Sequence, residues 1–271
     1  MKSYAHSAVT VINAMANGKG GAIGIDLGVF ADVDIVEEGL SGEILVRGEE
    51  YTDFSLINNI KTLIEERLDV DFGMDFMIHS EIPIGKGLKS SSAVSNAVTK
   101  ATVKALDFEI EDIDIIKIGI EASKRAGVTL TGAFDDAYAS YFGGFCLTDN
   151  LNNEVLKSED IDRYKIVILI PDETVLTSSL KDVSFKDIRP YIDLIFESAL
   201  NGRWKEAIYL NGLVYSSFFG YDVSVMMDVL EFSKTVGLSG KGPAVYSITD
   251  HPSDVIEKWK PHGEILEVHT T

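Results

Sequence analysis

Apolar residues near the start of the chain are mostly β-branched and alternate with polar residues, which is the pattern of half-buried strands. Further along, apolar residues recur every three or four positions, which predicts helices with one buried face. Before residue 150, the expected strands cover residues 7–12, 30–35, 42–46 and 72–82. The expected helices there cover residues 56–68, 90–106, 113–126 and 135–141.

The second part of the chain mixes the two patterns differently. Its expected strands cover residues 164–170, 244–248 and 264–269, and its expected helices cover residues 189–200, 204–217, 223–235 and 253–258. Because strands and helices do not alternate regularly, we expect an α+β fold rather than a doubly wound sheet. Residues 18–21, Gly-Lys-Gly-Gly, read as a loop. Alanines at every fourth position of one helix predict close packing on a neighbour: Ala93, Ala97, Ala101 and Ala105.

Composition narrows the possible functions. The 271 residues include 24 Lys and Arg against 43 Asp and Glu, so the net charge is −19. This acidity argues against a general nucleic-acid-binding protein and against docking on anionic lipid, since both need clustered cations. Cys146 is the only cysteine, so no internal disulfide can form, and the scattered histidines lack the spacing of a zinc site. With no signal-peptide pattern and no apolar run of about 20 residues, we expect a cytoplasmic protein.

The segment richest in candidate chemistry follows the strand expected over residues 72–82. A proline ends the strand, a loop with two glycines follows, and three serines open the alanine-rich helix. Glycines let backbone N–H groups turn toward a ligand, and a helix start adds unpaired N–H donors and the positive end of its dipole. Serines can cap the helix or donate to phosphate oxygens, and lysines add positive charge. The polyphosphate site predicted here consists of Pro83, Ile84, Gly85, Lys86, Gly87, Leu88, Lys89, Ser90, Ser91, Ser92 and Ala93.

Two adjacent carboxylates form a second candidate site. Asp135 and Asp136 lie among small and apolar residues, where a desolvated carboxylate is costly unless it is used or paired. Either could bind a cation or accept a proton. Asp135 could instead only cap the short helix beside it.

These segments together resemble the GHMP kinases, a family that includes galactokinase, homoserine kinase and mevalonate kinase. The residues whose spacing matches the family's phosphate loop are Pro83, Gly87, Leu88, Ser90 and Ser91. Asp136, followed by Gly143-Gly144, resembles the segment that carries the family's catalytic aspartate. Residues 239–243, Ser-Gly-Lys-Gly-Pro, resemble its third, glycine-rich motif. Lys89 stands where the family usually has glycine, and Ser92 stands where it has alanine.

Within the family, the sequence is most similar to the archaeal type of shikimate kinase. The residues that suggest this are Asn13-Ala14, Gly18-Lys19-Gly20, the three serines at 90–92, and residues 131–137. The resemblance implies a GHMP kinase fold, with an N-terminal domain over residues 1–150, a C-terminal α+β domain over residues 151–271, and the active site in the cleft between them. It also implies ATP-dependent phosphorylation of the 3-hydroxyl of shikimate.

The resemblance further implies roles for single residues. Backbone N–H groups between Gly85 and Ser92 would hold the β- and γ-phosphates of ATP, and Lys86 or Lys89 would offset developing charge. Ser91, with Glu121, would hold Mg²⁺. Asp136 would accept the proton of the substrate hydroxyl or orient that hydroxyl, with Asp135 as second choice. The candidates for substrate binding are Asn13, Lys19, Arg125, Ser239 and Gly240, of which Arg125 would pair with the substrate carboxylate.

Two other interpretations stay open at this point. The chain could be another small-molecule GHMP kinase, such as homoserine kinase, or a non-catalytic homologue that binds a ligand. The Lys-x-x-Leu-x-Gly-Glu-His string of the mevalonate and galactose kinases is absent, which argues against those two substrates.

Overall fold

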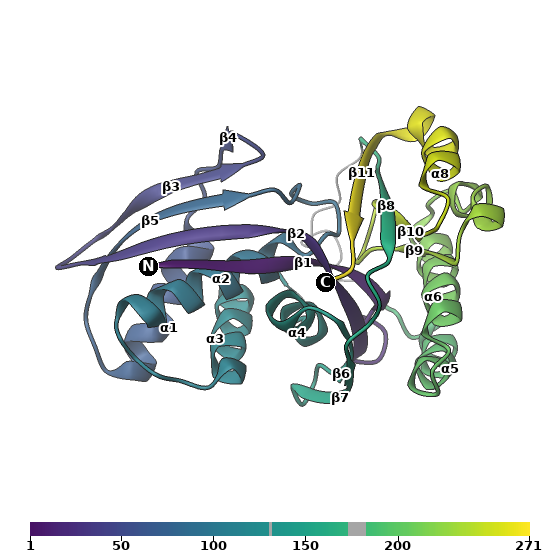
Figure 1. The fold of residues 1–271 in the computed structure, drawn as a ribbon. Helices are drawn as coiled ribbons and strands as arrows, with labels where there is room; N and C mark the ends of the chain where they lie inside the picture. The colour runs from purple at the N-terminus through teal and green to yellow at the C-terminus, as the bar shows by residue number, and fades with distance from the viewer. Residues whose placement is uncertain (130–131, 173–182) are drawn as a thin grey trace.

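The computed structural model describes residues 1–129, 132–172 and 183–271, and these residues form two β-sheets with helices packed on them (Figure 1). The larger sheet takes its strands from the first part of the chain, and the smaller sheet takes them from the second part. The expected α+β class is confirmed. Thr131, which belongs to the segment that resembles shikimate kinase, lies outside the described residues.

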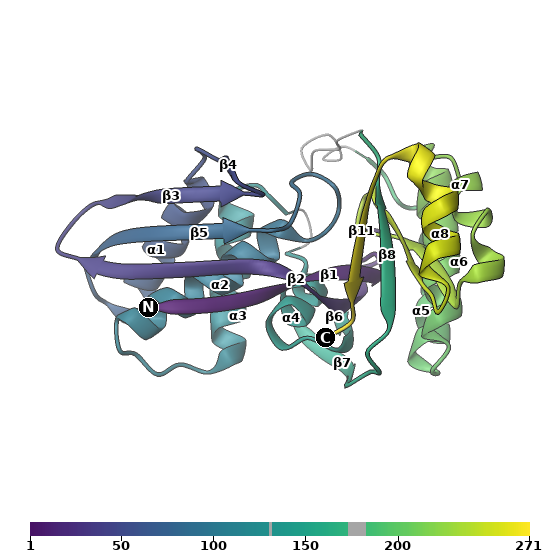
Figure 2. The same cartoon turned by 45° about the horizontal axis from the view of Figure 1, so that its top comes forward.

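In the described chain, the larger sheet has seven strands, in the order β4-β3-β5-β2-β6-β7 with β1 paired to β2. Strands β3 and β5 are parallel, and the other neighbours are antiparallel. The strands are β1 (Lys2–Ile12), β2 (Lys19–Val36), β3 (Leu40–Val46), β4 (Glu49–Glu50), β5 (Gly73–Ser80), β6 (Phe145–Asp149) and β7 (Glu154–Glu159). The helices on one face of this sheet are α1 (Ser55–Leu68), α2 (Ser90–Ala105), α3 (Asp112–Arg125) and α4 (Phe134–Phe142) (Figures 1 and 2).

The alanine row of α2 packs as its spacing predicts. Ala93, Ala97 and Ala101 are fully buried, and α2 lies against β1 and β2. Short side chains let a helix approach a sheet closely, because little volume separates the two backbones. This packing fixes the start of α2, where the three serines lie.

The smaller sheet is antiparallel and has the order β11-β8-β10-β9. Its strands are β8 (Lys165–Ile170), β9 (Thr235–Leu238), β10 (Val245–Ile248) and β11 (Glu264–His269). The helices beside it are α5 (Arg189–Leu200), α6 (Trp204–Phe219), α7 (Ser224–Met227) and α8 (Pro252–Trp259), with short 3₁₀ turns at Leu230–Phe232 and Lys260–His262. The large side chains of Tyr215, Tyr246 and Trp259 are fully buried in this part of the molecule.

Two expected elements are wrong. Residues 18–21 do not form a loop, because β2 begins at Lys19, and Gly20 and Gly21 pair with Thr148 and Leu147 of β6. Glycine is needed at both positions because neighbouring side chains pack closely against the backbone. A Cβ on Gly20 would lie 2.5 Å from the Asp135 carboxylate, and a Cβ on Gly21 would lie 2.5 Å from the Leu147 side chain.

The helix expected over residues 223–235 is also wrong. Only Ser224–Met227 is α-helical, and Thr235 already begins β9, which pairs with β10. The β-branched Thr235 and Val236 suit a strand, and the pairing with β10 overrides the helical period of the sequence. The sequence analysis also missed β6, β7 and β9, whose formation depends on pairing with other strands rather than on an apolar period of their own.

Hydrogen bonds tie the end of β1 to the second part of the fold. The Tyr246 hydroxyl donates to the backbone oxygen of Thr10 (2.7 Å), and the backbone N–H of Gly240 donates to the Thr10 hydroxyl (2.8 Å). The Tyr215 hydroxyl donates to the backbone oxygen of Asn13 (3.0 Å). These contacts hold the turn before β10 against the N-terminal strand and so set one wall of the site described below.

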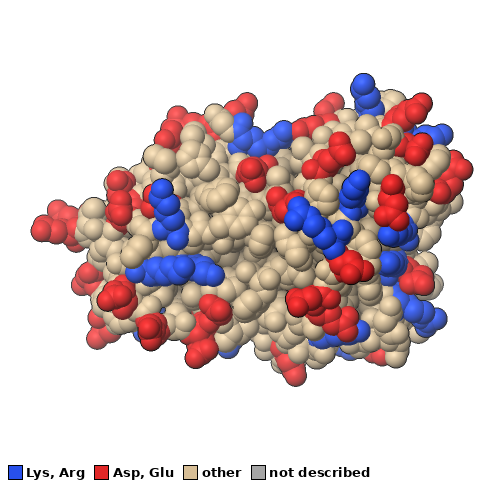
Figure 3. Space-filling model, in the orientation of Figure 1, with Lys and Arg blue, Asp and Glu red and all other residues tan. Residues whose placement is uncertain are grey.

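The surface carries no single acidic patch on the face that Figure 3 shows, where acidic side chains are spread among lysines and arginines. In the described part of the chain, no helix combines the length and the apolar character needed to cross a membrane.

Candidate active site

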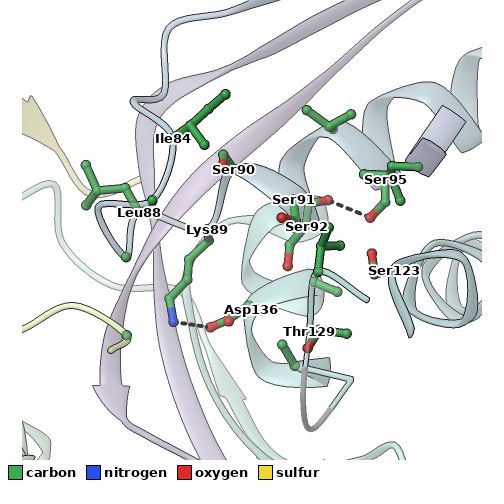
Figure 4. A pocket seen from close by; sticks show the side chains of 18 of the residues that line it. Ile84, Leu88, Lys89, Ser90, Ser91, Ser92, Ser95, Ser123, Thr129 and Asp136 are labelled. Atoms are coloured by element: carbon green, nitrogen blue, oxygen red, sulfur yellow. Dashed lines mark hydrogen bonds and ion pairs between the residues drawn. The ribbon is translucent and has the colours of Figure 1, made fainter. Parts of the chain in front are cut away.

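A cavity of about 550 Å³ lies where the two parts of the fold meet (Figure 4). Its walls include the loop before α2, the start of α4, and the turn at Gly240 and Lys241. Three segments that the sequence analysis singled out are therefore brought together. Because they come from both parts of the chain, the cavity occupies the expected cleft.

The loop before α2 has an unusual backbone. Gly85, Gly87 and Lys89 all have positive φ values, 72°, 84° and 60°. Lys89 is the last residue before α2, and in the described structure no side chain caps this helix. The serines are therefore not caps, which corrects one of the two roles considered for them. Ser90, Ser91 and Ser92 form the first turn of α2 and line the cavity, next to the unpaired N–H groups of the helix start (Figure 4).

The two lysines of the loop lie in different places. The Lys86 ammonium donates to the backbone oxygens of Pro171 (2.7 Å) and Asp172 (3.0 Å), and it does not line the cavity. The Lys89 ammonium instead reaches Asp136, with Nζ 2.9 Å from Oδ1 (Figure 4). Of the two candidates, Lys89 is thus the cation inside the cavity. Pro83 and Ala93, at the ends of the predicted segment, are also outside the lining.

The Lys89–Asp136 ion pair is well shielded from water. The two side chains are 10% and 12% exposed. Gly240 makes room for the ammonium, because a Cβ on this glycine would lie only 3.2 Å from Lys89 Nζ. A shielded pair of this kind interacts more strongly than an exposed one, since the surrounding protein screens charge less than water does.

Asp135 lies beside this pair but is held differently. It is 4% exposed, and its Oδ1 accepts a hydrogen bond from Asn150 Nδ2 (2.7 Å). Burial, together with the nearby charge of Asp136, raises the pKa of Asp135 to about 7. Asp135 does not cap α4, because the residue before the helix is Ala133 and both aspartates occupy its first turn. There the helix dipole favours negative charge.

The turn before β10 is fixed by side chains from elsewhere in the molecule. Asn13 Nδ2 donates to the backbone oxygen of Gly240 (2.8 Å), and the Ser239 hydroxyl donates to that of Gly87 (2.9 Å). The Tyr221 hydroxyl donates to the backbone oxygen of Lys241 (2.9 Å). Asn13 and Gly240 line the cavity, whereas Ser239 is fully buried beneath it.

Comparison with known proteins decides the family. A family model described as the GHMP kinases N terminal domain matches residues 55–144. The shikimate kinase of Pyrococcus furiosus is 52% identical over 264 residues, which are 97% of this chain and 97% of that protein. The shikimate kinase of Pyrococcus abyssi is 51% identical over 263 residues, which are 97% of this chain and 96% of that protein. The chain belongs to the GHMP kinase family.

The fold of this GHMP kinase agrees with its sequence relationship. The crystal structure of Methanococcus jannaschii mevalonate kinase superimposes with a TM-score of 0.79 at 16% identity, covering 100% of this chain and 98% of that one. The expected resemblance, the GHMP kinase fold and the expectation of a kinase are confirmed.

Some predicted site residues of this kinase lie outside the cavity lining. The Lys19 ammonium lies over the ring of Phe196, 5.4 Å from its centroid. Arg125 is on the exposed side of α3, where its guanidinium contacts Glu66 of α1 (3.0 Å) and Glu121 (3.4 Å). The sequence could not show this, because the bidentate partner Glu66 lies 59 residues away.

Few of the described side chains at the cavity could bind Mg²⁺. Among the described residues, no group of three or more His, Cys, Asp or Glu side chains could hold a metal ion. Mg²⁺ at phosphoryl-transfer sites is usually held by one or two protein ligands together with substrate phosphates. The hydroxyl of Ser91 at the cavity wall fits that arrangement. Glu121 does not fit, because its carboxylate is outside the lining and paired with Arg125.

The sequence analysis missed two parts of the cavity. One is an apolar wall formed by Ile44, Val46 and Tyr51, from β3 and the segment after β4. The other is Lys241, which stands in the third motif and lines the cavity. The alternating apolar residues of β3 predicted a strand but could not show that the strand ends at a ligand cavity.

Proposed function

We propose that this GHMP kinase transfers the γ-phosphoryl group of ATP to the 3-hydroxyl of shikimate. The observation that carries the proposal is the shielded Lys89–Asp136 pair, placed beside the hydroxyl-rich start of α2. Relatives named shikimate kinase, about half identical over nearly the whole chain, support the choice of acceptor.

The phosphate loop supplies positive potential without a large cluster of cations. The N–H groups at the start of α2 and the glycine-containing loop before it would bind the β- and γ-phosphates. Lys89 directly precedes α2, and its ammonium would offset the charge that develops during phosphoryl transfer. The apolar wall of Ile44, Val46 and Tyr51 offers a surface for the nucleoside base.

Mg²⁺ would be held by the Ser91 hydroxyl and the phosphates, and when bound it neutralises phosphate charge. The protein's remaining contribution is positioning, because phosphoryl transfer needs little covalent help.

Asp136 is the residue proposed to accept the hydroxyl proton or to orient the hydroxyl. It lines the cavity, and one of its carboxylate oxygens lies 2.9 Å from the Lys89 ammonium, so the carboxylate is held where an acceptor hydroxyl could reach it. Asp135 is proposed to support it, because the hydrogen bond from Asn150 and the burial hold its carboxyl group in place at the cavity wall. Further hydroxyl groups face the same cavity from Ser95, Ser123 and Thr129 (Figure 4).

A coupled assay for ADP release tests the function directly. The purified protein would be given ATP and Mg²⁺ with shikimate, homoserine or mevalonate as acceptor. We expect turnover with shikimate and none with the other two above the acceptor-free background. An Asp136→Asn preparation, purified in parallel, controls for contaminating kinases. Preferred turnover of homoserine or mevalonate, or ATP binding with no turnover of any acceptor, would overturn the proposal.

A further inference from the structure

We propose that two buried asparagines, Asn96 and Asn150, are positioning residues that hold the Asp136 carboxylate at the cavity. Each of them holds one chain neighbour of Asp136 through side-chain hydrogen bonds. Neither asparagine lines the cavity, so both act through Asp136 rather than on a ligand. The inference rests on the proposed function and deepens it, since it names the groups that fix the carboxylate proposed to receive the acceptor hydroxyl.

Asn150 holds Asp135, the residue before Asp136, at two points. It is 2% exposed and directly follows β6, and its backbone N–H donates to the oxygen of Gly18 (2.8 Å). Its Nδ2 donates to Asp135 Oδ1 (2.7 Å), and its Oδ1 accepts from the Asp135 backbone N–H (3.2 Å). The Thr148 hydroxyl donates to the same Oδ1 (2.7 Å), which fixes the direction of the amide. One side chain thus holds both the backbone and the carboxyl group of Asp135.

The bond to the Asp135 N–H takes the place of a helix cap. The first N–H groups of a helix have no partner within it, and a polar side chain just before the helix often accepts one of them. The residue just before α4 is Ala133, whose side chain cannot accept a hydrogen bond. Asn150 supplies the acceptor from the turn after β6 instead. Because helix ends tend to fray, this bond stabilises the first turn of α4, which contains Asp136.

Asn96 holds the residue after Asp136. It lies in the middle of α2, is 1% exposed, and donates from Nδ2 to the backbone oxygen of Ala137 (2.8 Å). Its Oδ1 is buried and has no hydrogen-bond partner among the described residues, which costs stability. The next two residues of α2, Ala97 and Val98, are buried and apolar, so an apolar residue at position 96 would suit packing alone. The contact with α4 therefore accounts for the amide better than packing does.

The two asparagines restrict the Asp136 side chain from both directions along the chain. Asn150 holds the residue before it, Asn96 holds the residue after it, and the Lys89 ammonium holds its carboxylate at 2.9 Å. A misplacement of a reacting group by about 1 Å can lower a rate about 100-fold. Loss of either asparagine should therefore slow the transfer step. Substrate binding should change little, because neither side chain reaches the cavity.

The test uses two variants with matched controls. Asn96→Leu removes the amide and keeps a side chain of similar volume, and Thr99→Val is its control, because Thr99 Oγ1 is also buried on α2 without a partner among the described residues. Asn150→Ala removes the second contact. Asn152→Ala is its control, because Asn152 is an exposed residue of the same turn whose side chain bonds to Asp149.

Three measurements would be made on each protein. Steady-state kinetics with shikimate give kcat and KM. Calorimetry with a non-hydrolysable ATP analogue gives nucleotide affinity and counts the sites that bind nucleotide, so that kcat can be expressed per binding site. Urea unfolding gives the stability of the fold.

We expect Asn96→Leu and Asn150→Ala each to lower kcat per binding site about 10- to 100-fold. KM for shikimate and affinity for the ATP analogue should stay within about twofold of wild type. Asn96→Leu should unfold at no lower urea concentration than wild type, because it removes a buried atom without a partner. Both control variants should keep wild-type kinetics. A merely structural role predicts the opposite, namely lower stability with a normal kcat per binding site.

Asn150→Asp keeps the shape of the amide and tests the hydrogen bond to Asp135. The new carboxyl can make this bond only while one of the two carboxyls is protonated. The charged groups near Asp135 are Asp136 and Lys89, and burial together with Asp136 raises the pKa of Asp135 to about 7. At high pH both carboxyls would therefore be ionised and would repel each other. Relative to wild type at the same pH, kcat of this variant should be about tenfold higher at pH 6 than at pH 9. If Asn150→Ala does not fold, this comparison decides the role of Asn150.

Four results would overturn the assignment. A wild-type kcat per binding site in Asn96→Leu or in Asn150→Ala would remove that asparagine from it. A loss confined to KM or to nucleotide affinity would show that the asparagines shape the cavity instead. An equal loss of kcat in Asn150→Asp at both pH values would show that the hydrogen bond to Asp135 does not position Asp136. If wild type binds the ATP analogue but does not phosphorylate shikimate, the proposed function fails and the assignment fails with it, whereas the first three results leave wild-type turnover intact.

Discussion

The ammonium of Lys89 lies 2.9 Å from Oδ1 of Asp136, so a residue of the loop before α2 pairs with the carboxylate proposed to receive the acceptor hydroxyl. Lys89 replaces the glycine that the family usually has, and it keeps the backbone conformation that glycine favours, with φ of 60°. The same residue, Lys89, thus both replaces the usual glycine and forms the ion pair with Asp136. Both can be tested by mutation.

Replacing Asp136 by asparagine should lower kcat by at least about 100-fold, because the variant can neither accept a proton nor pair with Lys89. Binding of ATP should change little, since the N–H donors of α2 remain. The coupled assay should show the loss of turnover, and calorimetry should show that ATP affinity is retained. Near-normal turnover would remove Asp136 from the reaction.

Replacing Lys89 by methionine or by glycine should lower turnover in both cases, because both variants lack the ammonium. The two should differ in stability. Glycine adopts the left-handed backbone at this position at no steric cost, whereas methionine does not, so Lys89→Gly should be more stable than Lys89→Met by about 1 kcal/mol. Urea unfolding measures this difference, and the loss of the ion pair cancels because it is common to both. Equal stability would show that the backbone at position 89 is not strained.

Replacing Gly20 by alanine should displace the Asp135 carboxylate, which lies 2.5 Å from the position of the new Cβ. We expect a loss of about 1–3 kcal/mol in the free energy of unfolding, as for other overpacked sites. In an Asp135→Ala background the same substitution should cost less, because the clashing carboxylate is gone. The four proteins form a double-mutant cycle, and an identical cost in both backgrounds would contradict the predicted contact.

Stability should also depend on pH through Asp135, whose pKa is raised from 3.8 to about 7. In the folded protein the carboxyl stays protonated up to about pH 7, whereas in the unfolded chain it ionises near pH 3.8. Its contribution to stability is therefore full below pH 3.8 and is lost as the pH rises to about 7.

The Asp135→Asn variant lacks this titration and serves as the comparison. Relative to wild type, its free energy of unfolding should increase between pH 5 and 7 by on the order of 1 kcal/mol per pH unit and stay level above that. Denaturant titrations of both proteins at a series of pH values measure the effect. A difference that does not change with pH would mean that Asp135 is already ionised in the folded protein at pH 5.

The sequence predicted the parts of the site that depend on local spacing. The glycines and serines around Gly87 and Ser91 specify a loop and a helix start within a dozen residues, and the structure places them at the cavity. Most helices and strands were predicted near their observed positions because their apolar period is local. The adjacent aspartates were recognisable because charge among apolar residues is unusual.

The parts that sequence reasoning missed depend on tertiary partners. Whether Lys86 or Lys89 enters the cavity is decided by Asp136 and by the carbonyls of residues 171–172, all far from either lysine in sequence. From the sequence, Arg125 was expected to bind the substrate carboxylate. In the structure, its guanidinium instead contacts Glu66 of α1, which the sequence could not show. Gly20 resembled a loop residue because nothing local reveals that β6 pairs with it.

Gly87 and Gly240 line the cavity, and Gly20 packs against Asp135, which also lines it. At Gly20, Gly87 and Gly240, a Cβ would meet, respectively, the Asp135 carboxylate, the backbone oxygen of Ser239, and the Lys89 ammonium together with the backbone of Gly87. Any residue that replaces a glycine carries at least a Cβ. At these three positions that Cβ would lie close to neighbouring atoms, so even the smallest substitution would disturb the packing. Single substitutions at these glycines would therefore disturb the packing around the cavity. A change of acceptor during evolution would need substitutions at other positions, such as those at the ends of the turn before β10.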